Sequence, residues 1–338
     1  MADIFGLTLL AIATIVIVWI FDFVNGFHDS ANSIATVIAT KVLTPIQAVA
    51  MAAFFNFIGI LMGGAVAATI QKGIIDQQIV VDYGLPLVLS ALLGAIIWDL
   101  ITWWLGIPTS SSHALVGGLL GAGGAVAGLA AVSWAGTSKT IIFIVVSPVV
   151  GLVVGFLMVA LVIRLMLRSN HAKSNKWFRK LQLISSAFYS FTHGTNDAQK
   201  GMGMIMMVLV ISGAAGVNDH VFLWVAISCH ASIALGTFFG GWRIVKTMAS
   251  RITKLEPYQG FSAETAAATV LAATAQFGIP VSTTHTISGS IMGVGAAKRM
   301  SAVRWGLGRK IVWAWVFTIP ASATIAGAIF WSYMNFLT

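Results

Sequence analysis

Two similar runs of hydroxyl-bearing residues are the part of this sequence best suited to bind a ligand. Residues 106–113 read GIPTSSSH, and residues 278–285 read GIPVSTTH. Proline disrupts a helix and keeps the preceding residue out of the α conformation, so each run should end one helix and begin another. The N-terminus of the new helix would present free N–H groups and hydroxyls, which favour an anion. The side chains expected to bind it are Thr109, Ser110, Ser111, Ser112, Ser282, Thr283 and Thr284.

A second pair of similar segments carries aspartate. Residues 26–29 read GFHD and residues 194–197 read GTND, and each lies within a long apolar segment that we expect it to break. A carboxylate inside such a segment usually marks an ion path, because an unpaired charge there is costly. The expected cation-binding residues are Asp22, Asn25, Asp29 and Asp197, with Asp29 and Asp197 as ligands if the ion is Na⁺ rather than H⁺. Candidate further donors to the anion are Asn32, Thr195 and Asn196.

Simpler interpretations of both pairs remain open. The hydroxyls could serve only to cap their own helices or to pack them together. Each aspartate could be a structural residue that pairs with the backbone or, for Asp197, with Lys200. The duplication of both motifs favours a binding site.

Composition places these motifs in a membrane protein. Of the 338 residues, 58% are hydrophobic and only 9% are charged, whereas a soluble domain carries about 25% charged residues. Apolar segments long enough to cross the bilayer recur along the chain. The first of them, residues 5–24, has no basic segment before it and is predicted to be a retained helix, not a cleaved signal. The single cysteine, Cys229, excludes a disulfide framework.

The basic residues predict the orientation. Fifteen of the 19 lie in residues 164–180, 243–254 and 298–310. Short loops rich in Lys and Arg stay cytoplasmic, so the net charge of +9 needs no nucleic-acid partner to explain it. Following the chain from these loops places both termini on the extracytoplasmic side.

The same path divides the chain into two inverted repeats. Each repeat consists of two spans, a broken helical hairpin and a third span, and the second repeat begins on the opposite side from the first. The predicted units are residues 1–167, a basic cytoplasmic linker at 168–180, and residues 181–338. Matching motifs support the division, because Asp29 and Asp197 are 168 positions apart and Pro108 and Pro280 are 172 apart. The predicted fold is an all-α membrane bundle whose two hairpins converge on a site near the midplane.

The motifs resemble a known family. Residues 25–33 (NGFHDSANS) and 193–201 (HGTNDAQKG) are similar to the two signatures of the PiT family of inorganic phosphate transporters, and the two proline runs and residues 260–264 (GFSAE) resemble it as well. The resemblance implies a symporter of orthophosphate with Na⁺ or H⁺, in some bacterial members as a neutral metal–phosphate complex. It implies no organic cofactor, a place in the plasma (inner) membrane and, more weakly, a homodimer. His28 stands where many members have Asn, which leaves the coupling ion open.

Other functions are also considered. The family includes sulfate carriers, and sulfate is tetrahedral like phosphate. A passive anion channel would need no aspartate-rich segments. An intramembrane hydrolase is disfavoured, because the neighbours Ser112 and His113 project to different faces of a helix and the duplicated pattern offers no single nucleophile, base and acid. We therefore expect a transporter that is not an enzyme.

Overall fold

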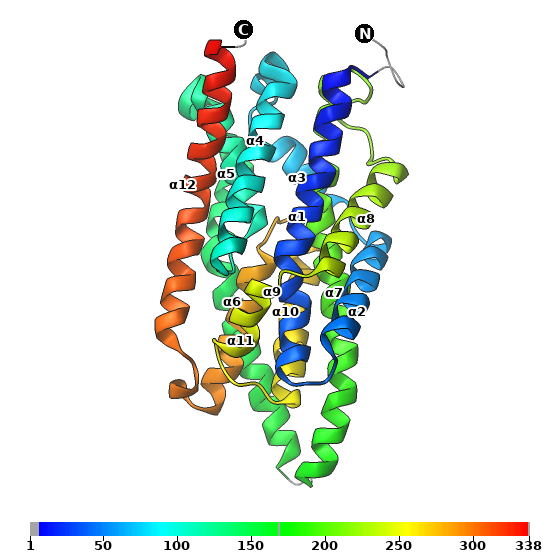
Figure 1. Cartoon of the computed structure of the whole chain (residues 1–338), viewed down its shortest axis with the longest axis vertical. Coiled ribbons are helices and arrows are strands. Elements are labelled where there is room, and N and C mark those ends of the chain that lie inside the picture. The colour runs from blue at the N-terminus through cyan, green and yellow to red at the C-terminus, as the bar shows by residue number, and fades with distance from the viewer. Residues whose placement is uncertain (1–6, 168–169, 337–338) are drawn as a thin grey trace.

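The computed structural model describes residues 7–167 and 170–336, and within these ranges the chain is helical without a β-sheet. Figure 1 shows an elongated bundle with both described chain ends at the same end of the long axis. The helices are α1 (Leu9–Ala39), α2 (Pro45–Ile58), α3 (Ala65–Gly73), α4 (Gln77–Leu105), α5 (Ser111–Ala127), α6 (Trp134–Met166), α7 (His171–Ile211), α8 (Leu223–Phe239), α9 (Trp242–Ser250), α10 (Pro257–Gln276), α11 (Thr283–Lys298) and α12 (Trp305–Phe336), with short 3₁₀ turns at Gly59–Leu61, Gly128–Ala131 and Met300–Ala302.

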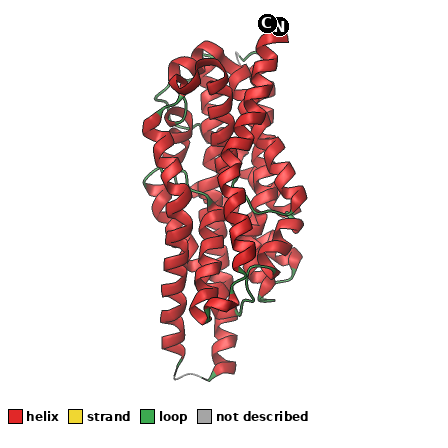
Figure 2. Cartoon of the chain, turned by 90° about the vertical axis from the view of Figure 1, so that its left-hand side faces the viewer, coloured by secondary structure: helices red, strands yellow, loops and turns green. Residues whose placement is uncertain are grey.

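Several helices are long enough to cross a membrane. Five of the described helices pass by length and apolar composition, and up to seven spans result if the bent pairs α2–α3 and α8–α9 each count as one. The basic segments 164–167, 170–180, 251–254 and 298–304 lie at the end opposite to the termini, whereas α9, which carries Arg243 and Lys246, lies nearer mid-height (Figures 1 and 2). Both described chain ends thus lie opposite to most of the basic segments, as the predicted path requires, while the sidedness in the cell stays a prediction.

The two halves have the same layout in opposite directions. α1 and α7 run antiparallel to each other along the bundle (Figure 1). The hairpin α4–α5 enters from the end that carries the termini, the hairpin α10–α11 enters from the basic end, and both turn back near the middle. The predicted broken hairpins at Pro108 and Pro280 are therefore present, and their turns come together at mid-height.

Each hairpin packs against the last helix of the other half. α5 lies along α12, and α11 lies along α6. Glycines at matching places allow these backbones to approach closely: a Cβ added at Gly121 would lie 2.0 Å from the carbonyl oxygen of Ala323, and one at Gly293 would lie 2.0 Å from that of Leu152. Small residues are the usual means of close helix packing in membranes. The two halves are consequently interlocked.

Two features of the predicted layout need correction. α1 and α7 continue without interruption through Asp29 and Asp197, so the expected breaks there are wrong. The polar side chains of these segments find partners on other helices and leave the backbone hydrogen bonds intact. The interruptions lie instead between α2 and α3, bent by 81°, and between α8 and α9, bent by 69°, where Gly63 and Gly240 adopt positive φ angles.

The basic linker predicted at 168–180 is also mostly helical. Residues 168 and 169 lie outside the described residues, and α7 begins at His171. The helical part of this segment therefore extends α7 beyond the bundle core (Figure 2). The repeat boundaries at 167 and 181 stay a prediction.

The first prediction concerns the glycines that close the inner ends of α4 and α10. Gly106 and Gly278 have φ angles of +66° and +63°, a conformation that costs other residues about 1–2 kcal/mol. Gly106→Ala and Gly278→Ala should each lower the thermal midpoint of the purified protein in detergent. Gly124→Ala is the matched control, because Gly124 is helical and a Cβ there meets nothing within 4 Å. Equal shifts for all three variants would contradict this account of the turns.

Candidate functional site

The two hairpin turns touch each other in the middle of the bundle. The Ser112 hydroxyl lies 3.4 Å from the carbonyl oxygen of Val281. Each turn begins a helix as the sequence predicts: the Ser110 hydroxyl accepts a hydrogen bond from the His113 N–H at 3.3 Å, and Ser282 accepts one from His285 N–H at 3.1 Å. For these two serines the capping interpretation is therefore confirmed. All seven predicted hydroxyl side chains of the turns are buried.

Threonine hydroxyls of the second turn contact α1 and α7. Thr284 Oγ1 lies 3.3 Å from a carboxylate oxygen of Asp29 and accepts from the Asn32 amide at 2.9 Å. Thr283 Oγ1 lies 3.5 Å from Asp197. The structure thus brings the second predicted anion-binding turn and two of the three predicted cation-binding carboxylates, Asp29 and Asp197, into one cluster.

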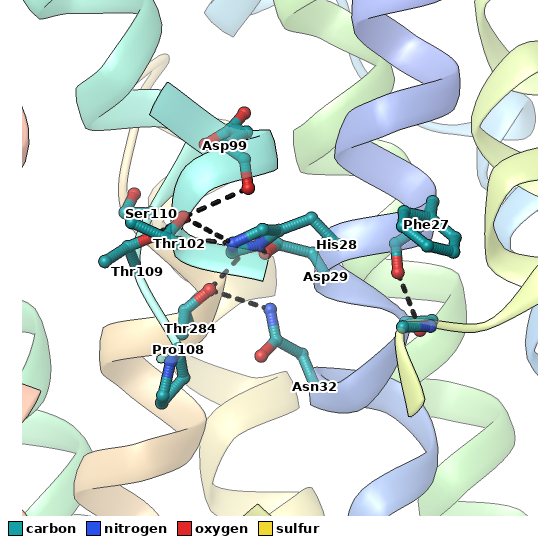
Figure 3. Close-up of polar contacts among 12 residues, drawn as sticks. Phe27, His28, Asp29, Asn32, Asp99, Thr102, Pro108, Thr109, Ser110 and Thr284 are labelled. Carbon is teal, nitrogen blue, oxygen red and sulfur yellow. Dashed lines mark hydrogen bonds and ion pairs between the residues drawn. The ribbon is translucent and has the colours of Figure 1, made fainter. Parts of the chain in front are cut away.

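Asp29 sits in a network that also includes the first hairpin. Its Oδ1 lies 2.7 Å from Nδ1 of His28. The other ring nitrogen of His28 lies 3.1 Å from Thr102 Oγ1 and 3.4 Å from Thr109 Oγ1. Figure 3 shows these side chains facing one another, with Asn32 one turn further along α1. His28 therefore connects Asp29 to the first hairpin.

Asp197 is surrounded by nitrogen donors. The Lys200 ammonium lies 3.2 Å from Asp197 Oδ1 and donates to Ser112 Oγ at 3.0 Å. His193 Nε2 lies 3.4 Å from Asp197 Oδ2. The Asn25 amide, oriented by its partners, donates to Ser111 and to Asp197 and accepts from Lys200 at 3.2 Å. The alternative pairing of Asp197 with Lys200 is thus present, but within the binding cluster and not apart from it.

Three of these residues could together hold a metal ion. Asp29, His193 and Asp197 are buried, and each offers a ligand atom within 4.8 Å of the others. Hard cations such as Na⁺ prefer oxygen ligands, and the carboxylates and the hydroxyls of Thr283 and Thr284 supply them. The sequence prediction missed His193, although its place four residues before Asp197 on the same helix face could have revealed it.

Three predicted residues lie outside this cluster or are engaged elsewhere. Asp22 is two turns from Asp29 on α1, roughly 10 Å along the axis, and its buried carboxylate packs on Gly201 without a hydrogen-bond partner among the described residues. The Thr195 hydroxyl donates to the carbonyls of Gly59 and Phe191. The Asn196 amide donates to the carbonyls of Thr192 and Leu271.

Glu264 forms a further buried polar cluster that joins three helices. Its carboxylate accepts hydrogen bonds from Thr36 at 2.5 Å, Ser185 at 2.5 Å and Gln182 at 3.1 Å. The resemblance drew attention to this residue, and its partners show why a carboxylate is tolerated there: three donors from α1 and α7 satisfy it. It ties the first arm of the second hairpin to both central helices.

Two histidines at matching places in the repeats pack together. The rings of His113 and His285 have centroids 4.7 Å apart, and His285 stacks on Trp315 at 3.9 Å. The Trp315 indole donates to the carbonyl oxygen of Pro108. His113 makes no hydrogen bond with either ring nitrogen within the described part of the chain.

A short helix covers each hairpin turn from the side opposite to the hairpin's open end (Figure 1). Thr69 on α3 donates to the carbonyl oxygen of Gly278 at 2.7 Å, and Thr247 on α9 donates to that of Gly106 at 2.8 Å. These two contacts occupy matching positions in the repeats. With the cluster buried and both turns held, the structure is closed toward both ends.

Paired helix N-termini around a buried charged cluster, presented by hairpins of opposite direction, define a membrane transporter with inverted repeats. Residues 25–326 match the phosphate transporter family, and the chain belongs to that family.

Relatives and a solved structure agree with this assignment. A probable low-affinity inorganic phosphate transporter of Rhizobium meliloti is 52% identical over 96% of each chain. One of Bacillus subtilis is 43% identical, over 98% of this chain and 99% of the relative. The solved structure of a sodium-dependent phosphate transporter superimposes with a TM-score of 0.88 at 25% identity, covering 97% of this chain and 100% of that one. The predicted PiT membership is confirmed.

The second prediction tests the buried ion pair. Removing one partner of such a pair costs about 3–5 kcal/mol, because the other charge stays buried without compensation. Lys200→Met should therefore lower the thermal midpoint strongly, whereas the double variant Lys200→Met with Asp197→Asn should recover most of the loss. The midpoints of the single and double variants in detergent provide the measurement. Additive losses would show that the two side chains do not interact.

Proposed function

We propose that this transporter carries orthophosphate together with a cation that binds between Asp29 and Asp197. The observation that carries the proposal is the junction of two helix N-termini with two carboxylates in one buried cluster. A helix N-terminus attracts an anion through its dipole and free N–H groups. Carboxylates attract a cation. The two kinds of group side by side fit an anion and a cation that move together.

The anion would lie between the two turns. Ser111 and Ser112 of the first turn and Thr283 and Thr284 of the second already face the cluster through their hydroxyls. With phosphate present, these hydroxyls and the N–H groups beside them would turn from their present partners to its oxygens. Asn32, which now donates to Thr284, would supply a further donor. This assignment follows most of the set predicted from the sequence.

The charges of the cluster explain why a cation must accompany phosphate. Asp29 and Asp197 contribute two carboxylates, and within the described chain Lys200 contributes one ammonium, which contacts Asp197. Phosphate would add more negative charge to a site shielded from water, where an uncompensated charge is costly. A bound cation offsets this cost, so binding of the two ions becomes mutually dependent. Symport follows from that dependence.

Na⁺ is the first candidate for the coupling ion. The solved structure with the same fold is that of a sodium-dependent phosphate transporter, and the oxygen atoms around Asp29 and Asp197 suit a hard cation. H⁺ is the second candidate, because each carboxylate is in contact with a histidine, His28 or His193. Histidine changes its charge near neutral pH and could relay a proton.

Alternating access would use the two covering helices. Opening toward the end that carries the termini requires α3 to release Gly278, and opening toward the basic end requires α9 to release Gly106. The positive-inside rule makes the basic end cytoplasmic and the termini extracytoplasmic in the inner membrane. Sulfate transport and passive anion flux are the alternatives that the same experiment separates. We infer no enzymatic activity, and a homodimer stays a prediction from the resemblance.

The third prediction is the functional test. Proteoliposomes should accumulate radiolabelled phosphate when an inward Na⁺ gradient, or alternatively an inward H⁺ gradient, is imposed, and excess sulfate should not compete. Asp29→Asn and Asp197→Asn should each reduce gradient-driven uptake roughly tenfold or more, since a charge-assisted contact is worth about 1.5–3 kcal/mol. Asp82→Asn is the matched control, because Asp82 is an exposed carboxylate that accepts from Gln78.

Each failure has a distinct meaning. Flux that ignores both gradients would identify a passive channel, and competition by sulfate would identify a sulfate carrier. Unchanged coupled uptake in both aspartate variants would refute the cation site, even if phosphate transport itself is confirmed.

A further inference from the structure

A cavity of about 370 Å³ lies outside the cluster, against the turn of the second hairpin. It is formed by α3, by the beginning of α6 and by the turn itself. Its lining includes Thr69, Lys72, Ser133, Lys139, Phe277 and Gly278. It lies at the side from which α3 covers the turn, so an ion approaching the cluster from that side would pass through it.

The two lysines of this cavity are unusual in their location. Among the described residues, most other basic positions belong to segments at the opposite end of the bundle, Arg243 and Lys246 belong to α9 nearer the middle, and Lys200 lies inside the cluster (Figure 1). Lys72 and Lys139 come from different helices, α3 and α6, and line the same cavity. The end of the molecule with the fewest basic residues therefore places both of them at one entrance.

The charges of these lysines are not neutralised by ion pairs. Lys72 donates to the neutral amide of Asn218 at 2.9 Å, and within the described residues no carboxylate lies within 4.0 Å of either ammonium. The acidic residues near this end do not pair with these lysines: Asp76 accepts from the N–H of Gln78, Asp82 accepts from the Gln78 side chain, and Asp219 accepts from the N–H of Gly216. The cavity thus has a local positive charge that is available to an anion.

The inner wall of the cavity is the turn that must move for the cluster to open. Thr69, three residues before Lys72 and on the same face of α3, donates to the carbonyl oxygen of Gly278. Two residues beyond Pro280 the turn reaches Ser282, the N-cap of α11. An anion held in the cavity would therefore lie against this turn.

We propose that this cavity is an anion antechamber, in which Lys72 and Lys139 hold orthophosphate before the turn opens and the anion passes to the cluster. The inference rests on the proposed phosphate transport and adds a second, outer binding site to it. Phosphate is held there by charge and not by a closed set of donors, so the site is weak and accepts other small oxyanions. Its effect is to raise the local phosphate concentration at the entrance.

The experiment measures the initial rate of radiolabelled phosphate uptake into vesicles of one known orientation, with the cavity outside, over a range of phosphate concentrations. Lys72→Gln combined with Lys139→Gln should raise KM roughly threefold to tenfold and leave the maximal rate unchanged. Because exposed charges are screened by salt, the KM of the unchanged protein should rise with ionic strength, and that of the double variant should rise much less.

Matched variants separate charge from structure. Lys72→Arg with Lys139→Arg keeps both charges and should keep the original KM. Lys254→Gln removes an exposed lysine at the opposite end and should also keep it. An unchanged KM and salt dependence in the double glutamine variant would overturn the antechamber, as would a loss of maximal rate with constant KM.

The antechamber can fail while the proposed phosphate transport holds, and the two failures can be told apart. If the unchanged protein takes up no phosphate under any gradient, the proposed function fails. If it transports phosphate and the lysine variants behave like it, only the antechamber fails.

Discussion

Backbone that leaves its helix inside a bilayer has no water to satisfy its polar groups, and this constraint organises the whole molecule. Two hairpins turn back at mid-height, so their free N–H groups and hydroxyls must find partners within the protein. They find them in each other and in the polar side chains of α1 and α7. The long central helices stay continuous because their function is to supply those partners. The cluster is at once the structural solution for the turns and the place where ions can bind.

The need to satisfy buried polar groups also explains the charge balance of the cluster. A cluster with carboxylates, hydroxyls and one buried ammonium is stable only while its charges remain paired. An entering ion must therefore replace existing contacts, not fill an empty space. Lys200 is central here, because it contacts Asp197, Asn25 and Ser112 at the same time. Any movement of the first turn that displaces Ser112 also changes the surroundings of Asp197, which would couple the proposed anion-binding turn to the proposed cation-binding carboxylate.

The sequence predicted local features well and tertiary ones poorly. Pro108 and Pro280 mark the turns because proline acts on its own neighbours, and the spacing of matching motifs reveals the repeat. The bends after α2 and α8 were missed, since glycines such as Gly63 and Gly240 are common in membrane helices and only their φ angles distinguish them. The breaks expected at the aspartates were wrong because their side chains are satisfied by other helices. The contact of Lys200 with Ser112 joins residues 88 positions apart and depends on packing alone.

Each hairpin packs against a helix of the other half. The order in which the helices are synthesised therefore limits when each hairpin can dock. The glycine-lined face of the first hairpin packs on α12, which is synthesised after both hairpins, whereas α6 is already present when the second hairpin emerges. Until α12 is in place, the face of α5 that carries Gly117 and Gly121 has only lipid or other proteins to cover it. Biogenesis is thus asymmetric even though the two halves have the same layout: the second hairpin can dock as it is made, and the first must wait for α12.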